Sequence, residues 1–99
     1  MSAIRHVVAI TFRDDTSDAT RAEIIDALRG LPASISEIEN YEVGYDVGRS
    51  EGNATLAIVA DFASWADYEV YRDHPAHHEV IGLIAPVVSA RAAVQHERA

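Results

Sequence analysis

The fold is decided by the stretch Ile4-Arg5-His6-Val7-Val8-Ala9-Ile10-Thr11-Phe12. An extended strand would place every second residue from Ile4 to Phe12 on one face, and all of these are apolar except His6. The opposite face is also largely apolar beyond Arg5. The stretch from Ala54 to Phe62 is similarly apolar on both sides. The two stretches therefore predict strands that need a cover on each face.

The rest of the chain predicts helices and two further strands. A polar turn at residues 13–18 is rich in N-cap residues, and apolar side chains follow it at helical spacing to about Arg29. Gly30 and Pro32 stand where a helix ends. We expect the other elements to be a strand from Tyr41 to Val47, a hairpin loop at 48–53, a strand from Ala54 to Phe62, a helix from Trp65 to Asp73, a helix from Pro75 toward Ile84 or Ala85, and a strand from Arg91 to Glu97.

The order of these elements is β-α-β-β-α-β, which predicts a ferredoxin-like α+β fold in one domain over residues 1–99. In a two-layer domain of this kind the helices cover one face of the sheet. The strands with two apolar faces would leave the other face bare. An identical sheet is the simplest cover, so we predict a homodimer that closes through its sheet faces.

Composition narrows the classes of partner. The formal net charge is −8, from sixteen acidic residues against eight basic ones, all arginine. A chain this acidic repels phosphate backbones, so we expect no nucleic acid partner. No apolar run reaches the roughly 20 residues of a spanning helix, so we expect no membrane partner. The lack of cysteine excludes disulfides and thiolate metal sites, and it fits a cytoplasmic location.

The stretch most informative about chemistry is Tyr71-Arg72-Asp73-His74-Pro75-Ala76-His77. It places Tyr71 before and His77 after a break between two helices, because the residue before a proline avoids helical angles. A neutral imidazole is a base near neutral pH, and a tyrosine hydroxyl within reach polarises a carbonyl or protonates an enolate. The plainer alternatives are a core aromatic for Tyr71 and, for His77, a histidine that donates to a carbonyl at the break.

Three other histidines bear on this site. His6 lies on the apolar face of the first strand, where a histidine is more often hydrogen-bonded in the core than catalytic, and it gains interest only beside His77. His74 and His78 have the i,i+4 spacing of helical zinc ligands. However, His74 precedes Pro75 and should lie outside the helix, where that spacing loses its meaning. We therefore expect no metal site.

Several segments resemble the stress-responsive A/B barrel (Dabb) family. They are Ile4-Arg5-His6-Val7-Val8, the strand end Asp61-Phe62, and Tyr71 followed by His74-Pro75-Ala76-His77, and the resemblance runs from about Ile4 to Glu97. It implies a dimeric ferredoxin-like α/β barrel. The family includes plant stress proteins, bacterial proteins without a known activity, and a plant polyketide cyclase. That cyclase closes a poly-β-keto thioester by an intramolecular aldol condensation, without cofactor or metal.

The resemblance implies a cofactor-free cyclase or lyase site, between the sheet and the helices of each protomer, for an apolar or β-keto small molecule. His77 and Tyr71 would be the working pair, with His6 in the same pocket. Leu56 stands where the cyclase has a further pocket histidine, so the substrate does not carry over. The substrate-binding residues that we expect are Val8, Ile10, Ile24, Leu28, Leu56 and Ile58. The alternatives are a non-catalytic structural barrel, in which the motif only fixes the helix break, and a barrel that binds a ligand without converting it.

Overall fold

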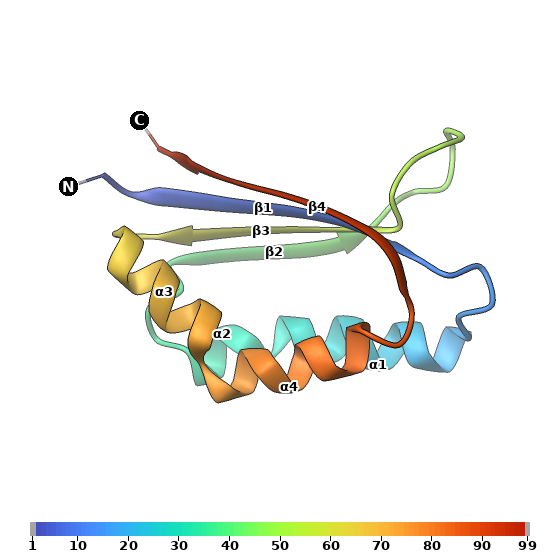
Figure 1. Cartoon of the computed structure of the whole chain (residues 1–99), viewed down its shortest axis with the longest axis horizontal. Helices are drawn as coiled ribbons and strands as arrows, with labels where there is room; N and C mark the ends of the chain where they lie inside the picture. Colours follow the sequence, from blue (N-terminus) through green and yellow to red (C-terminus); the bar gives the residue numbers. More distant parts are fainter. Residues whose placement is uncertain (1, 99) are drawn as a thin grey trace.

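The computed structural model describes residues 2–98, so the ends of the expected domain, Met1 and Ala99, lie outside it. Within this range, four strands form one antiparallel sheet in the order β2-β3-β1-β4, and the helices form a second layer on one of its faces (Figure 1). The predicted order of strands and helices is confirmed, with one additional short helix at Leu31–Ser34 that the sequence analysis did not predict. The elements are β1 (Ile4–Phe12), α1 (Asp18–Arg29), α2 (Leu31–Ser34), β2 (Asn40–Tyr45), β3 (Leu56–Phe62), α3 (Trp65–Asp73), α4 (Pro75–Ile84) and β4 (Val88–Glu97).

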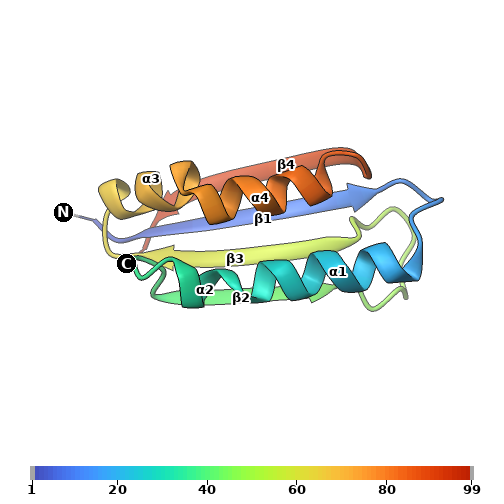
Figure 2. The same cartoon turned by 90° about the horizontal axis from the view of Figure 1, so that it is seen from below.

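The helical layer divides along the sheet. Seen from below, α1 lies beneath β2 and β3, whereas α4 lies beneath β1 and β4 (Figure 2). The core between the layers includes Ile24 of α1 and Phe62 of β3, both with no exposed surface. No helix within residues 2–98 is long and apolar enough to cross a membrane.

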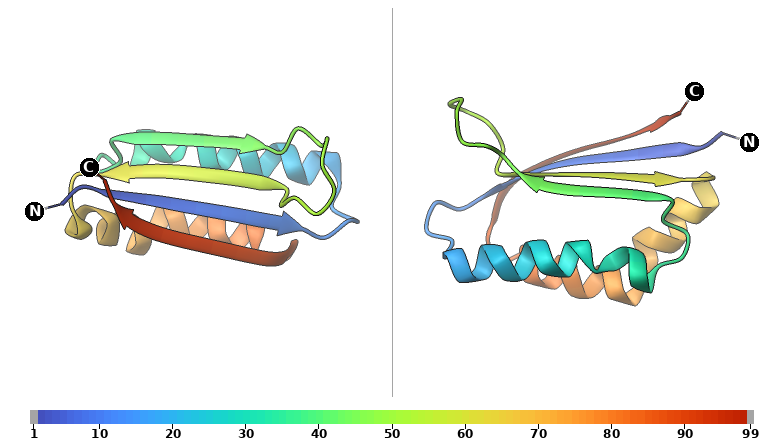
Figure 3. Two further views of the ribbon diagram at one scale, coloured as in Figure 1. Left: turned by 90° about the horizontal axis from the view of Figure 1, so that it is seen from above. Right: turned by 180° about the vertical axis from the view of Figure 1, so that it is seen from behind.

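Strand β1 is apolar on both sides, as its sequence predicts. The face that carries His6 is buried against the helices, and the face that carries Val7 is half-buried. Val7 pairs with Val59 of β3 on one side and with Val94 of β4 on the other. Val94 is 52% exposed. The far face of the sheet therefore presents apolar side chains that the helices do not cover, and Figure 3 shows this face from above.

The hairpin loop between β2 and β3 is longer than the sequence predicts. The first strand ends two residues early and the second begins two residues late, which gives β2 as Asn40–Tyr45 and β3 as Leu56–Phe62. The reason is Asp46, whose carboxylate accepts hydrogen bonds from the Gly48 N–H at 2.8 Å and from the Asn53 amide at 2.9 Å. This side chain holds the loop closed, so residue 46 belongs to the turn and not to the strand.

Two other boundaries also differ from the prediction. Strand β4 begins at Val88 and not at Arg91, because its pairing with β1 continues across a register shift as far as Phe12. Gly30 has a right-handed φ of −80°, and the chain turns directly into α2, whose first turn contains Pro32. Proline fits that position because the N–H that it lacks would have no partner there.

The break between α3 and α4 lies where the sequence predicts it. His74 has extended backbone angles (φ −66°, ψ 137°), and its Nδ1 accepts a hydrogen bond from the Ala76 N–H at 3.0 Å. Pro75 then begins α4. At the start of α3, Ser64 Oγ accepts a hydrogen bond from the Asp67 N–H at 3.1 Å. Each of these helices therefore begins with a side-chain cap.

Replacing His74 by alanine should lower the free energy of unfolding by about 1 kcal/mol, the usual cost of losing an N-cap. Urea denaturation measures this loss. Ser64→Ala removes the cap of the neighbouring helix and is the matched control, with a loss of similar size. An unchanged stability for His74→Ala would contradict the capping role.

Candidate functional site

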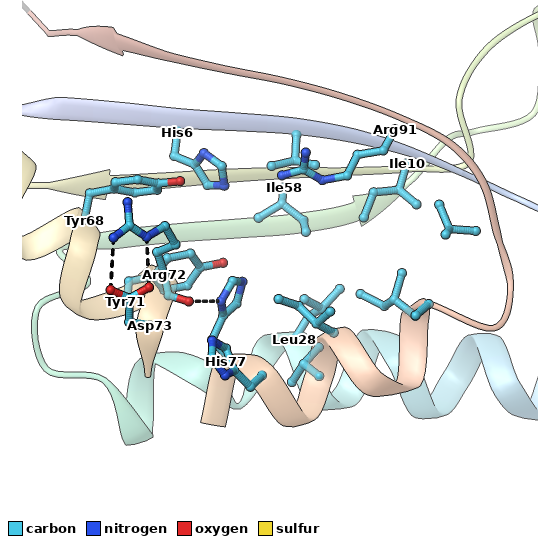
Figure 4. A pocket seen from close by; sticks show the side chains of 17 residues that line it. His6, Ile10, Leu28, Ile58, Tyr68, Tyr71, Arg72, Asp73, His77 and Arg91 are labelled. Carbon is cyan, nitrogen blue, oxygen red and sulfur yellow. Dashed lines mark hydrogen bonds and ion pairs between the residues drawn. The ribbon is translucent and has the colours of Figure 1, made fainter. Parts of the chain in front are cut away.

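A cavity of about 510 Å³ lies between the sheet and the helical layer (Figure 4). Helices α3 and α4 form one side of it, and β1 and β4 form most of the other. Its volume falls within the range of small-molecule sites. The lining residues are His6, Val8, Ile10, Leu28, Ile58, Tyr68, Tyr71, Arg72, Asp73, His77, His78, Val80, Ile81, Ile84, Ala85, Val88 and Arg91.

Most of the residues that the sequence analysis selected line this cavity, namely His6, Val8, Ile10, Leu28, Ile58, Tyr71 and His77. Ile24 and Leu56 do not line it, and here the structure differs from the expectation. Ile24 has no exposed surface and Leu56 is 2% exposed, because both pack within the hydrophobic core. Ile24 lies one turn before Leu28 on α1, and Leu56 lies between Ile10 and Tyr45 in the sheet.

The His77 ring packs against the Tyr71 ring, with centroids 4.3 Å apart. His77 Nδ1 lies 3.0 Å from the backbone oxygen of Arg72. Because a carbonyl oxygen only accepts hydrogen bonds, Nδ1 carries the proton, and Nε2 of the neutral ring carries the lone pair. Nε2 of His77 has no hydrogen-bond partner within residues 2–98. Every buried side-chain nitrogen and oxygen in that range does have a partner, so Nε2 is accessible to solvent or a ligand.

Burial holds His77 in its neutral form. Removal from water lowers the pKa of His77, and the nearby His78 and Arg91 lower it further, against the opposing effect of the Arg72 carbonyl. The imidazole is therefore a free base at neutral pH, with Nε2 as its accepting nitrogen.

Tyr71 is the partner of His77 on α3. It is 2% exposed, and burial raises its pKa, so its hydroxyl stays protonated. This hydroxyl lies 3.2 Å from the hydroxyl of Tyr41. Tyr41 was expected only as a strand residue, because its approach to Tyr71 depends on packing between β2 and α3. If Tyr41 donates to Tyr71, then Tyr71 keeps its own proton for a ligand.

His6 faces the same cavity from β1. Its Nδ1 accepts a hydrogen bond from the side-chain amide of Gln95 at 2.8 Å, so the proton of the neutral ring is on Nε2. Burial first, and then the charge of Arg91 and the nearby His77, lower the pKa of His6 to about 4. Its ring centroid lies 6.0 Å from that of Tyr71. His6 is therefore a neutral hydrogen-bond donor beside the pair.

Charged groups also reach the cavity. Asp73 accepts hydrogen bonds from Arg72 at 2.9 and 3.0 Å, so these two charges offset each other. Arg91 lines the cavity from β4 (Figure 4). Across residues 2–98, no group of three or more histidines and acidic residues is placed to hold a metal ion. The arrangement thus offers one accepting nitrogen on His77 and donors on Tyr71 and His6, in apolar surroundings.

The buried neutral His6 predicts a pH-dependent stability. Its folded-state pKa of about 4 lies below the ordinary value of 6.5, so between these values the unfolded chain binds a proton that the folded chain does not. The free energy of unfolding should therefore fall as the pH drops from 6.5 toward 4. His6→Asn preserves an acceptor for Gln95 but does not titrate, so its stability should fall less. Urea denaturation at several pH values measures both, and parallel profiles would contradict this prediction.

The chain is similar to one protein-family model and to several solved structures. The model of the Stress Responsive A/B Barrel Domain matches residues 4–97. No curated protein matches the sequence. The chain is 36% identical to a dimeric ferredoxin-like protein of unknown function from Thermobifida fusca, with a TM-score of 0.91, and the match covers 98% of this chain and 92% of that chain.

Two further structures have the same fold. A dimeric protein of unknown function from Bacteroides fragilis is 27% identical, with a TM-score of 0.86, and 99% of this chain and 98% of that chain are covered. A hydroxynitrile lyase from Passiflora edulis is 20% identical, with a TM-score of 0.87, and 99% of this chain and 94% of that chain are covered. The predicted ferredoxin-like fold and the predicted resemblance are confirmed, and the chain belongs to the stress-responsive A/B barrel family.

Proposed function

We propose that the chain is a cofactor-independent lyase or cyclase that acts on an apolar β-keto molecule. The observation that supports this most strongly is the open Nε2 of a neutral His77 beside the protonated Tyr71, in an apolar cavity. A base next to a hydrogen-bond donor is what removal of a proton alpha to a carbonyl requires.

In the proposed reaction, His77 Nε2 removes the alpha proton, and the electron pair of the broken C–H bond moves onto the carbonyl oxygen. The Tyr71 hydroxyl donates a hydrogen bond to this developing enolate, and the Nε2–H of His6, which lines the same cavity, would donate a second one. The alpha carbon then attacks a second carbonyl carbon of the same molecule. A carbon–carbon bond forms, and the new alkoxide takes the proton back from the His77 imidazolium. The reverse sequence is a retro-aldol cleavage.

Two further points support lyase chemistry on this scaffold. A hydroxynitrile lyase has the same fold, so the fold accommodates a lyase. The pKa of His77 is lowered and that of Tyr71 is raised, so both are in the protonation states that the proposed roles need at neutral pH.

His77→Asn is the sharpest test, because the asparagine amide can still donate to the Arg72 carbonyl while the Nε2 lone pair is gone. Turnover of linear poly-β-keto compounds, offered both as thioesters and as free acids and followed by mass spectrometry of the cyclised products, should fall by about 10²–10⁴. The melting temperature should change little. Tyr71→Phe keeps the ring against His77 and should also reduce turnover, by loss of the hydrogen bond to the enolate.

The structural-barrel alternative predicts the opposite pattern. His77 would then matter only through its bond to the Arg72 carbonyl, and Tyr71 only through its bond to Tyr41. The wild type would convert none of these compounds, and His77→Asn would change its stability little. If the wild type converts none of these thioesters or acids, or if they are converted as fast after His77→Asn, the proposed cyclase role is wrong.

We also propose that the chain forms a homodimer through the far face of its sheet. Val7 and Val59 lie on this face in the two central strands, and the exposed Val94 extends the patch onto β4. Burying such a patch against an identical sheet is favourable. The relative from Thermobifida fusca, at 36% identity, is described as dimeric.

Val94→Arg should convert the dimer to a monomer, because it would bury a charge between the two sheets. Sedimentation equilibrium measures the mass. Val70→Arg is the matched control, since Val70 is 43% exposed on α3, in the helical layer on the other face of the sheet. A Val94→Arg protein that remains a dimer would place the interface elsewhere.

A further inference from the structure

Arg91 is an exposed residue of β4 that also lines the cavity. It pairs directly with Ile10 in the β1–β4 register, and Ile10 is buried on the face that packs against the helices. Directly paired residues on neighbouring strands share a face. The Arg91 side chain therefore starts on the cavity side of β4, and Figure 4 shows it extending into the cavity, in the direction of His6.

The guanidinium of Arg91 has no counter-charge within residues 2–98. The ion pairs of that range involve Arg5, Arg13, Arg72 and Arg98. Asp73, the acidic residue of the cavity lining, is already paired with Arg72 at 2.9 Å. An arginine side chain stays protonated in proteins, so this charge is permanent.

Three other arginines of the described range (Arg21, Arg29 and Arg49) also form no ion pair, but Arg91 is the one of these four that lines the cavity. The chain has sixteen acidic residues and a net charge of −8. A carboxylate for Arg91 would be easy to supply from such a composition. The groups that face Arg91 across the cavity are instead neutral: it lowers the pKa of both His6 and His77, and neither imidazole can offset a positive charge. The cavity thus combines an apolar lining with one cation that has no protein partner in the described chain.

We propose that Arg91 binds the carboxylate of an apolar, monoanionic ligand whose hydrocarbon part lies along the cavity toward His77 and Tyr71. This inference rests on the proposed function, since it names the charge of the substrate of the same site: a keto acid and not a neutral ketone. The planar fork of a guanidinium matches a carboxylate through two parallel N–H···O bonds. The distinction matters chemically, because a fixed anion at one end orients the reactive carbonyl at the other.

The test uses matched pairs of probes that differ in charge and hardly in shape: hexanoate, octanoate and decanoate, each with its primary amide. Isothermal titration calorimetry of the wild-type protein should show each acid that fits binding at least about tenfold more tightly than its amide. Added salt should weaken the acids and not the amides. Equal affinity for acid and amide, or no measurable binding of any acid, would overturn the inference.

Arg91→Gln should remove this preference, leaving acid and amide with similar affinity. Arg91→Lys keeps the charge but not the fork, and it should retain an intermediate preference. Arg49→Gln is the matched control: it makes the same change in net charge on the exposed hairpin loop and should behave as the wild type. If Arg91→Gln still binds the acids more tightly than the amides, another group binds the carboxylate and the inference is wrong.

The two proposals fail in different ways. If acids bind through Arg91 but no β-keto compound is converted in a His77-dependent reaction, the ligand class stands and the proposed reaction is wrong. If His77→Asn abolishes turnover while Arg91→Gln leaves the binding of acids unchanged, the reaction stands and the role of Arg91 is wrong.

Discussion

Strand β1 is apolar on both faces, and most of the molecule follows from this constraint. The buried face supplies His6, Val8 and Ile10 to the cavity and holds the helical layer. The other face, which carries Val7, is left half-buried by a single chain. In a two-layer domain the helices cover only one face of a central strand. The strand that supplies the cavity residues therefore also has an apolar face that a second sheet would cover.

One hydrogen bond at the helix break, between His77 and the Arg72 carbonyl, has both a structural and a chemical consequence. The Arg72 carbonyl belongs to the last turn of α3, where backbone oxygens lack partners within the helix. His77 Nδ1 satisfies this oxygen, and in doing so it directs the lone pair to Nε2. A structural and a catalytic reading of the motif are therefore compatible: the hydrogen bond that stabilises the break is also the one that sets the tautomer of the base.

The sequence predicted the elements whose signals are local. β1, α3 and α4 have the expected bounds, because alternation, the Ser64 cap and His74-Pro75 act within a few residues. The start of β4 and the partners Tyr41, Gln95 and Arg91 were not predicted. β4 is rich in alanine and alternates weakly between polar and apolar residues, so its register with β1 could not be predicted from the sequence. That register places Gln95 opposite His6 and Arg91 opposite Ile10. Ile24 and Leu56 have the same kind of side chain as true lining residues, and only three-dimensional packing separates core from cavity.

The electrostatics of the cavity favour reactions that generate negative charge. Burial alone pushes the titratable groups toward neutrality, since it lowers the pKa of His6 and His77 and raises that of Tyr71. A proton that passes from a ligand to His77 meets the opposing charge of Arg91, which lowers the pKa of that ring. The anion left behind would find two neutral donors, in surroundings of low polarity that strengthen their hydrogen bonds, and the permanent charge of the exposed Arg91. In a protein with a net charge of −8, this local reversal of sign is what distinguishes the cavity from the rest of the chain.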